Sequence, residues 1–189
     1  MRSSLKIFLL VILLNACSSP ADKKQTGDEK PAVDSSTTVT KPADIPIPVA
    51  MVDGYKVVGD SLEIPAFQIE LQLSDRAEQK LKSKNESVIV SAYYSGTPKD
   101  KRHLVGSGEF DLAGTTVELT DSRVANLQGV KMAKKDLDKV TSKDIDVLIN
   151  VYSGRRSIAD NILDVDFLQK PISEVKGQKF VLKGKLIGE

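Results

Sequence analysis

The chain of 189 residues has one cysteine, one histidine and no tryptophan, and only 5% of its residues are aromatic. A single cysteine, Cys17, excludes an intrachain disulfide, and a single histidine excludes a metal site built from several histidines. The core must therefore be aliphatic. The sequence also lacks a glycine-rich phosphate loop and a dinucleotide fingerprint, so we expect no cofactor.

An excess of charge of one sign is missing as well. The chain holds 27 Lys and Arg residues against 26 Asp and Glu residues, a formal net charge of +1. Domains that bind nucleic acids usually carry a clear basic excess. We therefore expect no nucleic-acid partner.

The one long apolar run lies near the N-terminus. Arg2 and Lys6 precede residues 7–14, which carry no polar side chain. The run has the length of a signal-peptide core and is shorter than the roughly 20 residues that cross a bilayer. It ends in Leu14-Asn15-Ala16-Cys17, which resembles the lipobox of bacterial lipoproteins, although Asn15 departs from the usual small or β-branched residue. An ordinary secretory signal peptide is the alternative.

The lipoprotein resemblance implies that residues 1–16 are removed and that Cys17 carries a diacylglyceryl group and a further acyl chain such as palmitate. Two or more acyl chains anchor a protein stably, so the membrane becomes its partner. In this class the residue after the cysteine directs sorting. Ser18, in place of an aspartate, implies the outer membrane of a double-membraned cell, with the protein facing the periplasm.

Residues 17–50 have the composition of a linker. Five of the eight prolines fall here, among many Ser, Thr, Lys and Asp residues and few large apolar ones. Such a segment cannot bury enough apolar surface to offset the entropy of ordering. We therefore predict a lipidated, disordered tether over residues 17–50 and a folded domain over residues 51–189.

The folded part is predicted to be mainly β. Strict apolar alternation at residues 67–73 predicts a half-buried strand. Ser74 is a plausible N-cap for a helix at residues 75–84, with Ala77 and Leu81 as its apolar stripe. Further strands are expected at residues 88–94, 117–119, 147–152, 163–167 and 180–182, with a turn at Ala113-Gly114. The pattern predicts a β-sandwich with one or two short helices.

Residues 87–96 and 146–154 resemble each other, and both end in Ser-Gly. This echo suggests an internal duplication, with units at residues 64–112 and 124–168 sharing one strand order. Convergence of two similar strands is the alternative.

Two loops that follow predicted strands are the best chemical leads. One contains Lys99, Lys101 and Arg102, and the other contains Arg155 and Arg156. If the two units pair, these loops could converge on an anion such as a phosphate, a lipid head group or an acidic glycan. The alternative is two solvated hairpin tips whose charge discourages edge pairing.

Other candidate sites are weak. His103 lies near Ser107, but the glycines beside Ser107 do not have the spacing of a nucleophile elbow. Asp160, Asp164 and Asp166 offer oxygen ligands without the spacing of a calcium-binding loop. We therefore expect no catalytic residue and no metal site.

These observations favour a lipid-anchored envelope protein that acts as a non-enzymatic binding or assembly accessory module, with a protein or an envelope polymer as its partner. One alternative is an envelope hydrolase with an unrecognised site. Another is a module that binds glycans or anionic lipids weakly. Without tryptophan, a glycan platform would rest on Tyr93, Tyr94 and Tyr152, of which at least one per strand should be buried.

Overall fold

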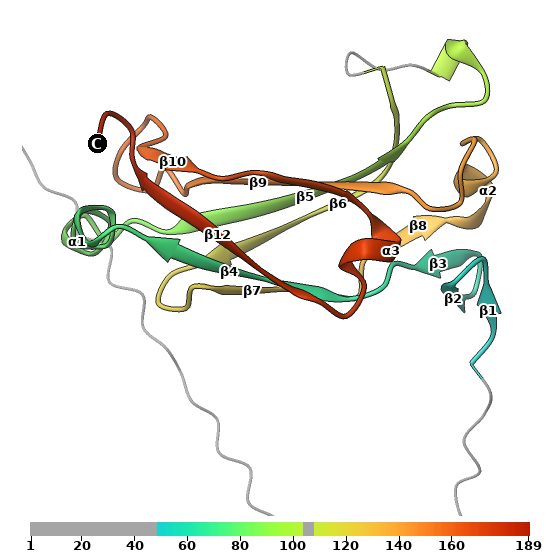
Figure 1. Cartoon of the computed structure of the whole chain (residues 1–189), viewed down its shortest axis with the longest axis horizontal. Helices are drawn as coiled ribbons and strands as arrows, with labels where there is room; N and C mark the ends of the chain where they lie inside the picture. The colour runs from blue at the N-terminus through green and yellow to red at the C-terminus, as the bar shows by residue number, and fades with distance from the viewer. Residues whose placement is uncertain (1–48, 104–107) are drawn as a thin grey trace, which may run out of the picture. The chain divides into compact units, whose positions relative to one another are not determined.

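The computed structural model describes residues 49–103 and 108–189. Cys17, the lipobox and the predicted tether up to residue 48 lie outside these residues. The compact unit spans Pro46–Glu189 and is mainly β, as predicted (Figure 1). In the described part of the chain, no helix is long and apolar enough to cross a membrane.

The described strands form three four-stranded sheets. Sheet A has the order β1 (Met51–Val52), β2 (Tyr55–Val58), β3 (Ser61–Glu63) and β8 (Lys131–Ala133). Sheet B has the order β10 (Leu163–Val165), β12 (Lys179–Leu186), β4 (Phe67–Leu73) and β7 (Val124–Leu127). Sheet C has the order β11 (Leu168–Pro171), β9 (Asp146–Ser153), β5 (Val88–Gly96) and β6 (Phe110–Leu119).

Short helical segments connect the strands. They are α1 (Asp75–Ser83), the 3₁₀ turn η1 (Lys101–His103), α2 (Lys134–Leu137) and α3 (Ile172–Val175). The Ser74 hydroxyl caps α1 by accepting a hydrogen bond from the Ala77 amide at 3.2 Å, and Ala77 and Leu81 are buried. The predicted cap and apolar stripe of this helix are therefore confirmed.

The core lies between sheets B and C. Ile69 and Leu71 of β4 belong to the same hydrophobic cluster as Val90 of β5 and Ile149 of β9. Alternate residues of each strand point into this cluster, and the residues between them point outward. Each of the two sheets therefore has one buried face and one outer face.

The predicted turn at Ala113-Gly114 is wrong, because β6 runs straight through it. The register of β6 against β5 shifts between Tyr94 and Ser95, where Leu112 is left over as the extra residue of a β-bulge. Long pairing with β5 outweighs the local turn preference. Gly114 instead lies opposite Tyr93.

The predicted duplication is wrong, although the two central strands resemble each other. β5 and β9 have similar alternation of burial and pair antiparallel with each other. The strand after β5 is β6, which stays beside it in sheet C, whereas the strand after β9 is β10, which pairs with β12 in sheet B. The two units therefore differ in strand order, which contradicts a complete repeat.

Candidate functional site

The outer face of sheet C is uncharged at its centre. The strand register aligns the outward residues in four successive rows across the sheet, which we call rungs. In order along the strands, the rungs are: Tyr152, Ile89 and Glu118; then Asn150, Ser91 and Thr116; then Gln169, Leu148, Tyr93 and Gly114; and last Pro171, Asp146, Ser95 and Asp111. The two middle rungs contain only hydroxyl, amide, aliphatic, aromatic and glycine residues. We call these two rungs together with Tyr152 the neutral face.

The three candidate tyrosines do not share one environment. Tyr94 is buried in the core with 1% of its surface exposed, whereas Tyr93 is 49% exposed. Tyr152 is half-buried, and its hydroxyl lies 3.1 Å from the Ser91 hydroxyl, which lies 3.3 Å from that of Thr116. The prediction of a buried tyrosine is confirmed for β5. The structure brings Tyr93 and Tyr152 to one face.

The exposure of Tyr93 follows from its neighbours. Gly114, its partner on β6, has no side chain to cover the ring, and Leu148 lies opposite on β9. At the other end of the neutral face, the guanidinium of Arg155 lies 5.8 Å from the centre of the Tyr152 ring, within cation–π range. The neutral face thus combines one open aromatic ring with a second ring held in place.

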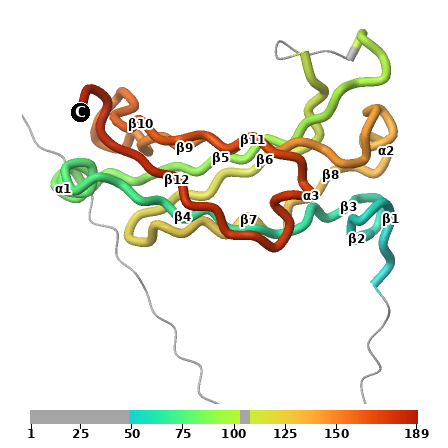
Figure 2. The backbone as a smooth tube through the Cα atoms, viewed as in Figure 1, coloured from blue at the N-terminus to red at the C-terminus, as the bar shows by residue number. Residues whose placement is uncertain are grey.

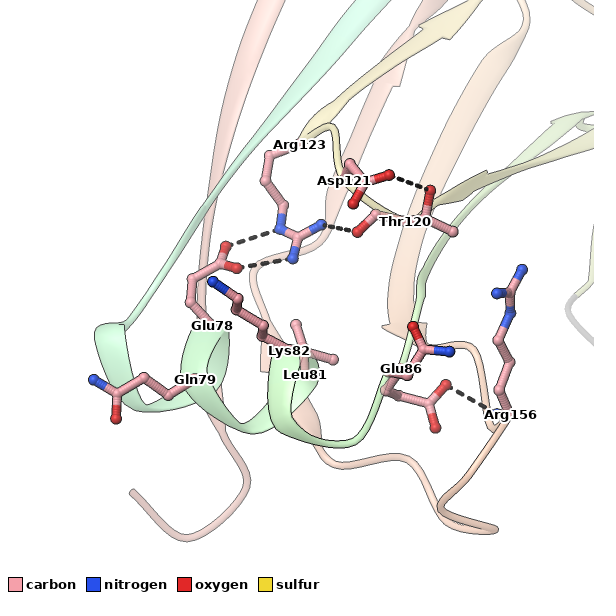
Figure 3. A pocket seen from close by; sticks show the side chains of 10 residues that line it. Glu78, Gln79, Leu81, Lys82, Glu86, Thr120, Asp121, Arg123 and Arg156 are labelled. Atoms are coloured by element: carbon pink, nitrogen blue, oxygen red, sulfur yellow. Dashed lines mark hydrogen bonds and ion pairs between the residues drawn. The ribbon is translucent and has the colours of Figure 1, made fainter.

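A cleft of about 430 Å³ opens beside α1 (Figure 3). Arg123, one of three cationic residues that line it, donates from Nε and Nη2 to the two carboxylate oxygens of Glu78, both at 2.8 Å. Nη1 of Arg123 donates to the carbonyls of Thr120 and Ser122 at 3.3 and 3.1 Å. Because this guanidinium is already engaged by the protein, it joins α1 to the β6–β7 turn and is not poised for a ligand.

Glu86, on the rim of the same cleft, is a buried carboxylate held by backbone amides. It accepts hydrogen bonds from the amides of Arg156 and Ser157 at 2.9 Å, Ile158 at 3.2 Å and Ser87 at 3.1 Å. Burial alone would raise the pKa of Glu86, but these amides stabilise the charged form and lower the pKa to about 2. The carboxylate thus fills the place that an anion would take in this loop.

The loop after β9 is fixed against the start of β5. The Gly154 amide donates to the Ser87 carbonyl at 2.8 Å, and a Cβ on Gly154 would lie only 1.9 Å from Ser87 Oγ. Ser87 Oγ donates to Glu118 at 2.6 Å, and Arg156 Nε donates to the same carboxylate oxygen at 2.8 Å. These contacts are structural, and they support the Tyr152 end of the neutral face.

The two predicted basic loops do not converge. β5 and β9 are antiparallel neighbours, so the loop after each lies at the opposite end of sheet C (Figures 1 and 2). Eight paired residues at about 3.4 Å each separate the ends by roughly 25 Å. A single anion site that joins Lys99, Lys101 and Arg102 to Arg155 and Arg156 is therefore wrong. The reason is the antiparallel pairing of the two units.

The first loop instead meets the segment around α2. The Lys99 amide donates to the Lys139 carbonyl and Lys99 Nζ to the Asp138 carbonyl, both at 2.8 Å. The pKa of Asp138 is lowered by a hydrogen bond from Lys143 and by the charges of Lys143, Lys99 and Lys134. The sequence did not predict this contact between the loop and the α2 segment, because the bridge between Pro98 and Val140 joins segments far apart in the chain.

The remaining candidates gain no support. Ser107 and the side chain of His103 lie outside the described residues. Asp164 pairs in register with Lys185, and Asp166 Oδ2 accepts the Lys183 amide at 3.2 Å. Within residues 49–103 and 108–189, no group of three His, Cys, Asp or Glu side chains could hold a metal ion.

No protein-family model, curated protein or solved structure matches this chain. The case for its function therefore rests on the geometry of its own surface.

Proposed function

We propose that the chain is a lipid-anchored binding module of the bacterial envelope that binds an uncharged glycan on the neutral face of sheet C. The observation that carries this proposal is the exposed ring of Tyr93 within two rungs free of charge. Aromatic residues are enriched in binding surfaces relative to the rest of a protein's surface.

The chemistry of the neutral face suits a sugar. An aromatic ring has a negative face that attracts the polarised C–H groups of a pyranose ring. Asn150 and Gln169 carry amides that both donate and accept, and Thr116 adds a hydroxyl at the edge. A neutral surface offers nothing to compensate the desolvation of a charged ligand, so it favours an uncharged polymer.

The proposed anchor at Cys17 would hold the domain at the membrane. Metabolic labelling with palmitate checks this part, because the Cys17→Ser variant should lose the label and leave the membrane fraction. An unlabelled wild-type chain would contradict the anchor without touching the binding face.

Binding is tested with immobilised neutral polysaccharides, using β-glucan, mannan and chitin fragments, with alginate as an anionic comparison. Tyr93→Ala should weaken retention on the preferred neutral polymer about tenfold or more, since truncated central aromatics carry much of an interface's energy. Val181→Ala is the matched control, because Val181 is 44% exposed on the outer face of sheet B. Equal losses in both variants, or binding to alginate alone, would overturn the proposal.

A further inference from the structure

A second surface of the domain carries a net positive charge. We call it the α2 corner, and it is defined by exposed Lys99, Lys134 and Lys135 together with exposed Lys101, two residues beyond Lys99 in the same loop. Lys99 and Lys101 belong to the loop that packs against the segment after α2, through the paired backbones of Pro98 and Val140. Lys134 and Lys135 form the first half of α2.

Most neighbouring charges at this corner are matched, although Asp60, whose backbone carbonyl accepts a hydrogen bond from the Lys134 amide at 3.1 Å, adds one negative charge beside α2. Arg102 pairs with Asp100, Lys139 with Asp136 at 2.6 Å, and Lys143 with Asp138 at 2.7 Å. Lys99 Nζ donates to a carbonyl, which carries no formal charge. Within the described part of the chain, no ion pair engages Lys101, Lys134 or Lys135. The four lysines therefore outnumber the acidic groups beside them, and the corner keeps a net positive charge.

The corner lies close to the point where the described chain begins. Lys134 follows β8 directly, and sheet A has the order β1-β2-β3-β8, so three strand spacings separate the corner from β1. Three spacings amount to about 14 Å. The chain enters β1 at Met51 after the predicted tether. An anchor at Cys17 would thus attach to the domain on its basic side.

We propose that the α2 corner docks on an anionic lipid surface, so that the domain rests on the bilayer with sheet A and α2 facing the head groups. This inference rests on the proposed lipid anchor, which supplies the nearby membrane. Charge complementarity selects anionic over zwitterionic lipid. Single exposed lysines attract such surfaces weakly, and clusters of them act together. The neutral face, on a different part of the domain, is left open for its ligand.

The test uses the chain from residue 17 onward with Cys17→Ser, so that no acyl chain contributes. Sedimentation with vesicles of phosphatidylcholine and phosphatidylglycerol in equal amounts is compared with sedimentation with phosphatidylcholine alone. Lys→Gln substitution at all four corner positions should lower the partition coefficient on the anionic vesicles by about tenfold or more. Raising the salt to about 0.5 M should remove most wild-type binding, because it screens the charges.

A matched control carries Lys→Gln at Lys80, Lys82, Lys84 and Lys183, four exposed lysines in α1, at its C-cap and in β12. It has the same net charge as the corner variant and should lose less than about threefold. Equal losses in the two variants would overturn the docking site and leave only attraction by net charge. Equal wild-type binding to both vesicle types would also overturn it. Either result is independent of palmitate labelling, which tests the anchor alone.

Discussion

Sheets B and C each turn one face to the solvent, and the two faces are built differently. On the outer face of sheet B, charges meet charges: Lys179 Nζ lies 2.7 Å from the Glu70 carboxylate, and Asp164 faces Lys185 across the β10–β12 pair. On sheet C, charge is confined to the end rungs and the middle rungs are neutral. Charged residues are the ordinary means of keeping a sheet surface in solution. A face without them, in the same domain, is the one to examine for a ligand.

The neutral face also has internal support that sheet B lacks. The hydroxyl of Tyr152 is linked through Ser91 to Thr116, and the loop beside Tyr152 is fixed by the buried Glu86. On sheet B, the side-chain contacts between Lys179 and Glu70 and between Gln68 and Asn126 lie at the surface. Variants at Glu86, Tyr152 and Glu70 would measure this difference in construction.

The largest effect is expected at Glu86. Glu86→Gln keeps the shape but removes the charge that four backbone amides stabilise, so unfolding by urea at pH 7 should show a loss of about 2–3 kcal/mol. The control Glu70→Gln on the outer face of sheet B should cost less than about 0.5 kcal/mol. Comparable losses in the two variants would remove the contrast between the faces.

The comparison of wild type with Glu86→Gln also predicts a pH dependence of stability. The pKa of Glu86 is about 2 in the folded protein and near 4.5 when unfolded, so its stabilisation is complete above pH 4.5 and lost as the pH falls towards 2. The advantage of wild type over Glu86→Gln should therefore shrink over this window, as measured by urea unfolding at several pH values. An advantage that stays constant down to pH 2.5 would contradict the amide-bound carboxylate.

A smaller effect is expected within the neutral face. Tyr152→Phe removes the hydroxyl that bonds Ser91, and it should cost about 1 kcal/mol in thermal unfolding. Tyr93→Phe is the control, since no hydrogen bond engages the Tyr93 hydroxyl among the described residues, and its stability should be unchanged. A loss of stability in Tyr93→Phe, with Tyr152→Phe unchanged, would contradict the hydrogen bond between Tyr152 and Ser91.

Local patterns of apolar alternation and helix capping predicted most of the fold. Strict alternation defined β4 to the residue, and Ser74 defined the start of α1. The errors lie where distant pairing decides the outcome. Gly114 was predicted to form a turn, but its pairing with β5 makes it part of β6. The strand that begins at Leu163 pairs with β12 rather than with β9. No local sequence feature indicates either pairing.

The candidate site could be predicted only in its parts. Tyr93, Tyr94 and Tyr152 were predicted as the possible platform, and strand alternation requires that Tyr93 and Tyr94 point to opposite faces without deciding which one faces outward. The shared face of Tyr93 and Tyr152, and the neutrality of the rungs between them, depends on the register of four strands. The basic loops were recognisable as chemistry, but the antiparallel pairing of β5 and β9 separates them and joins Lys99 to α2 instead.

The position of β12 has a consequence for how the molecule is made. This final strand lies between β10 and β4 and runs parallel to β4, more than a hundred residues earlier in the chain. The fit there is tight, since a Cβ on Gly184 would lie 2.7 Å from side-chain atoms of Leu73 and Val165. A polypeptide emerging N-terminus first cannot complete sheet B until residues 179–186 have emerged. A chain cut short before Lys179 would leave β4 and β10 with open edges.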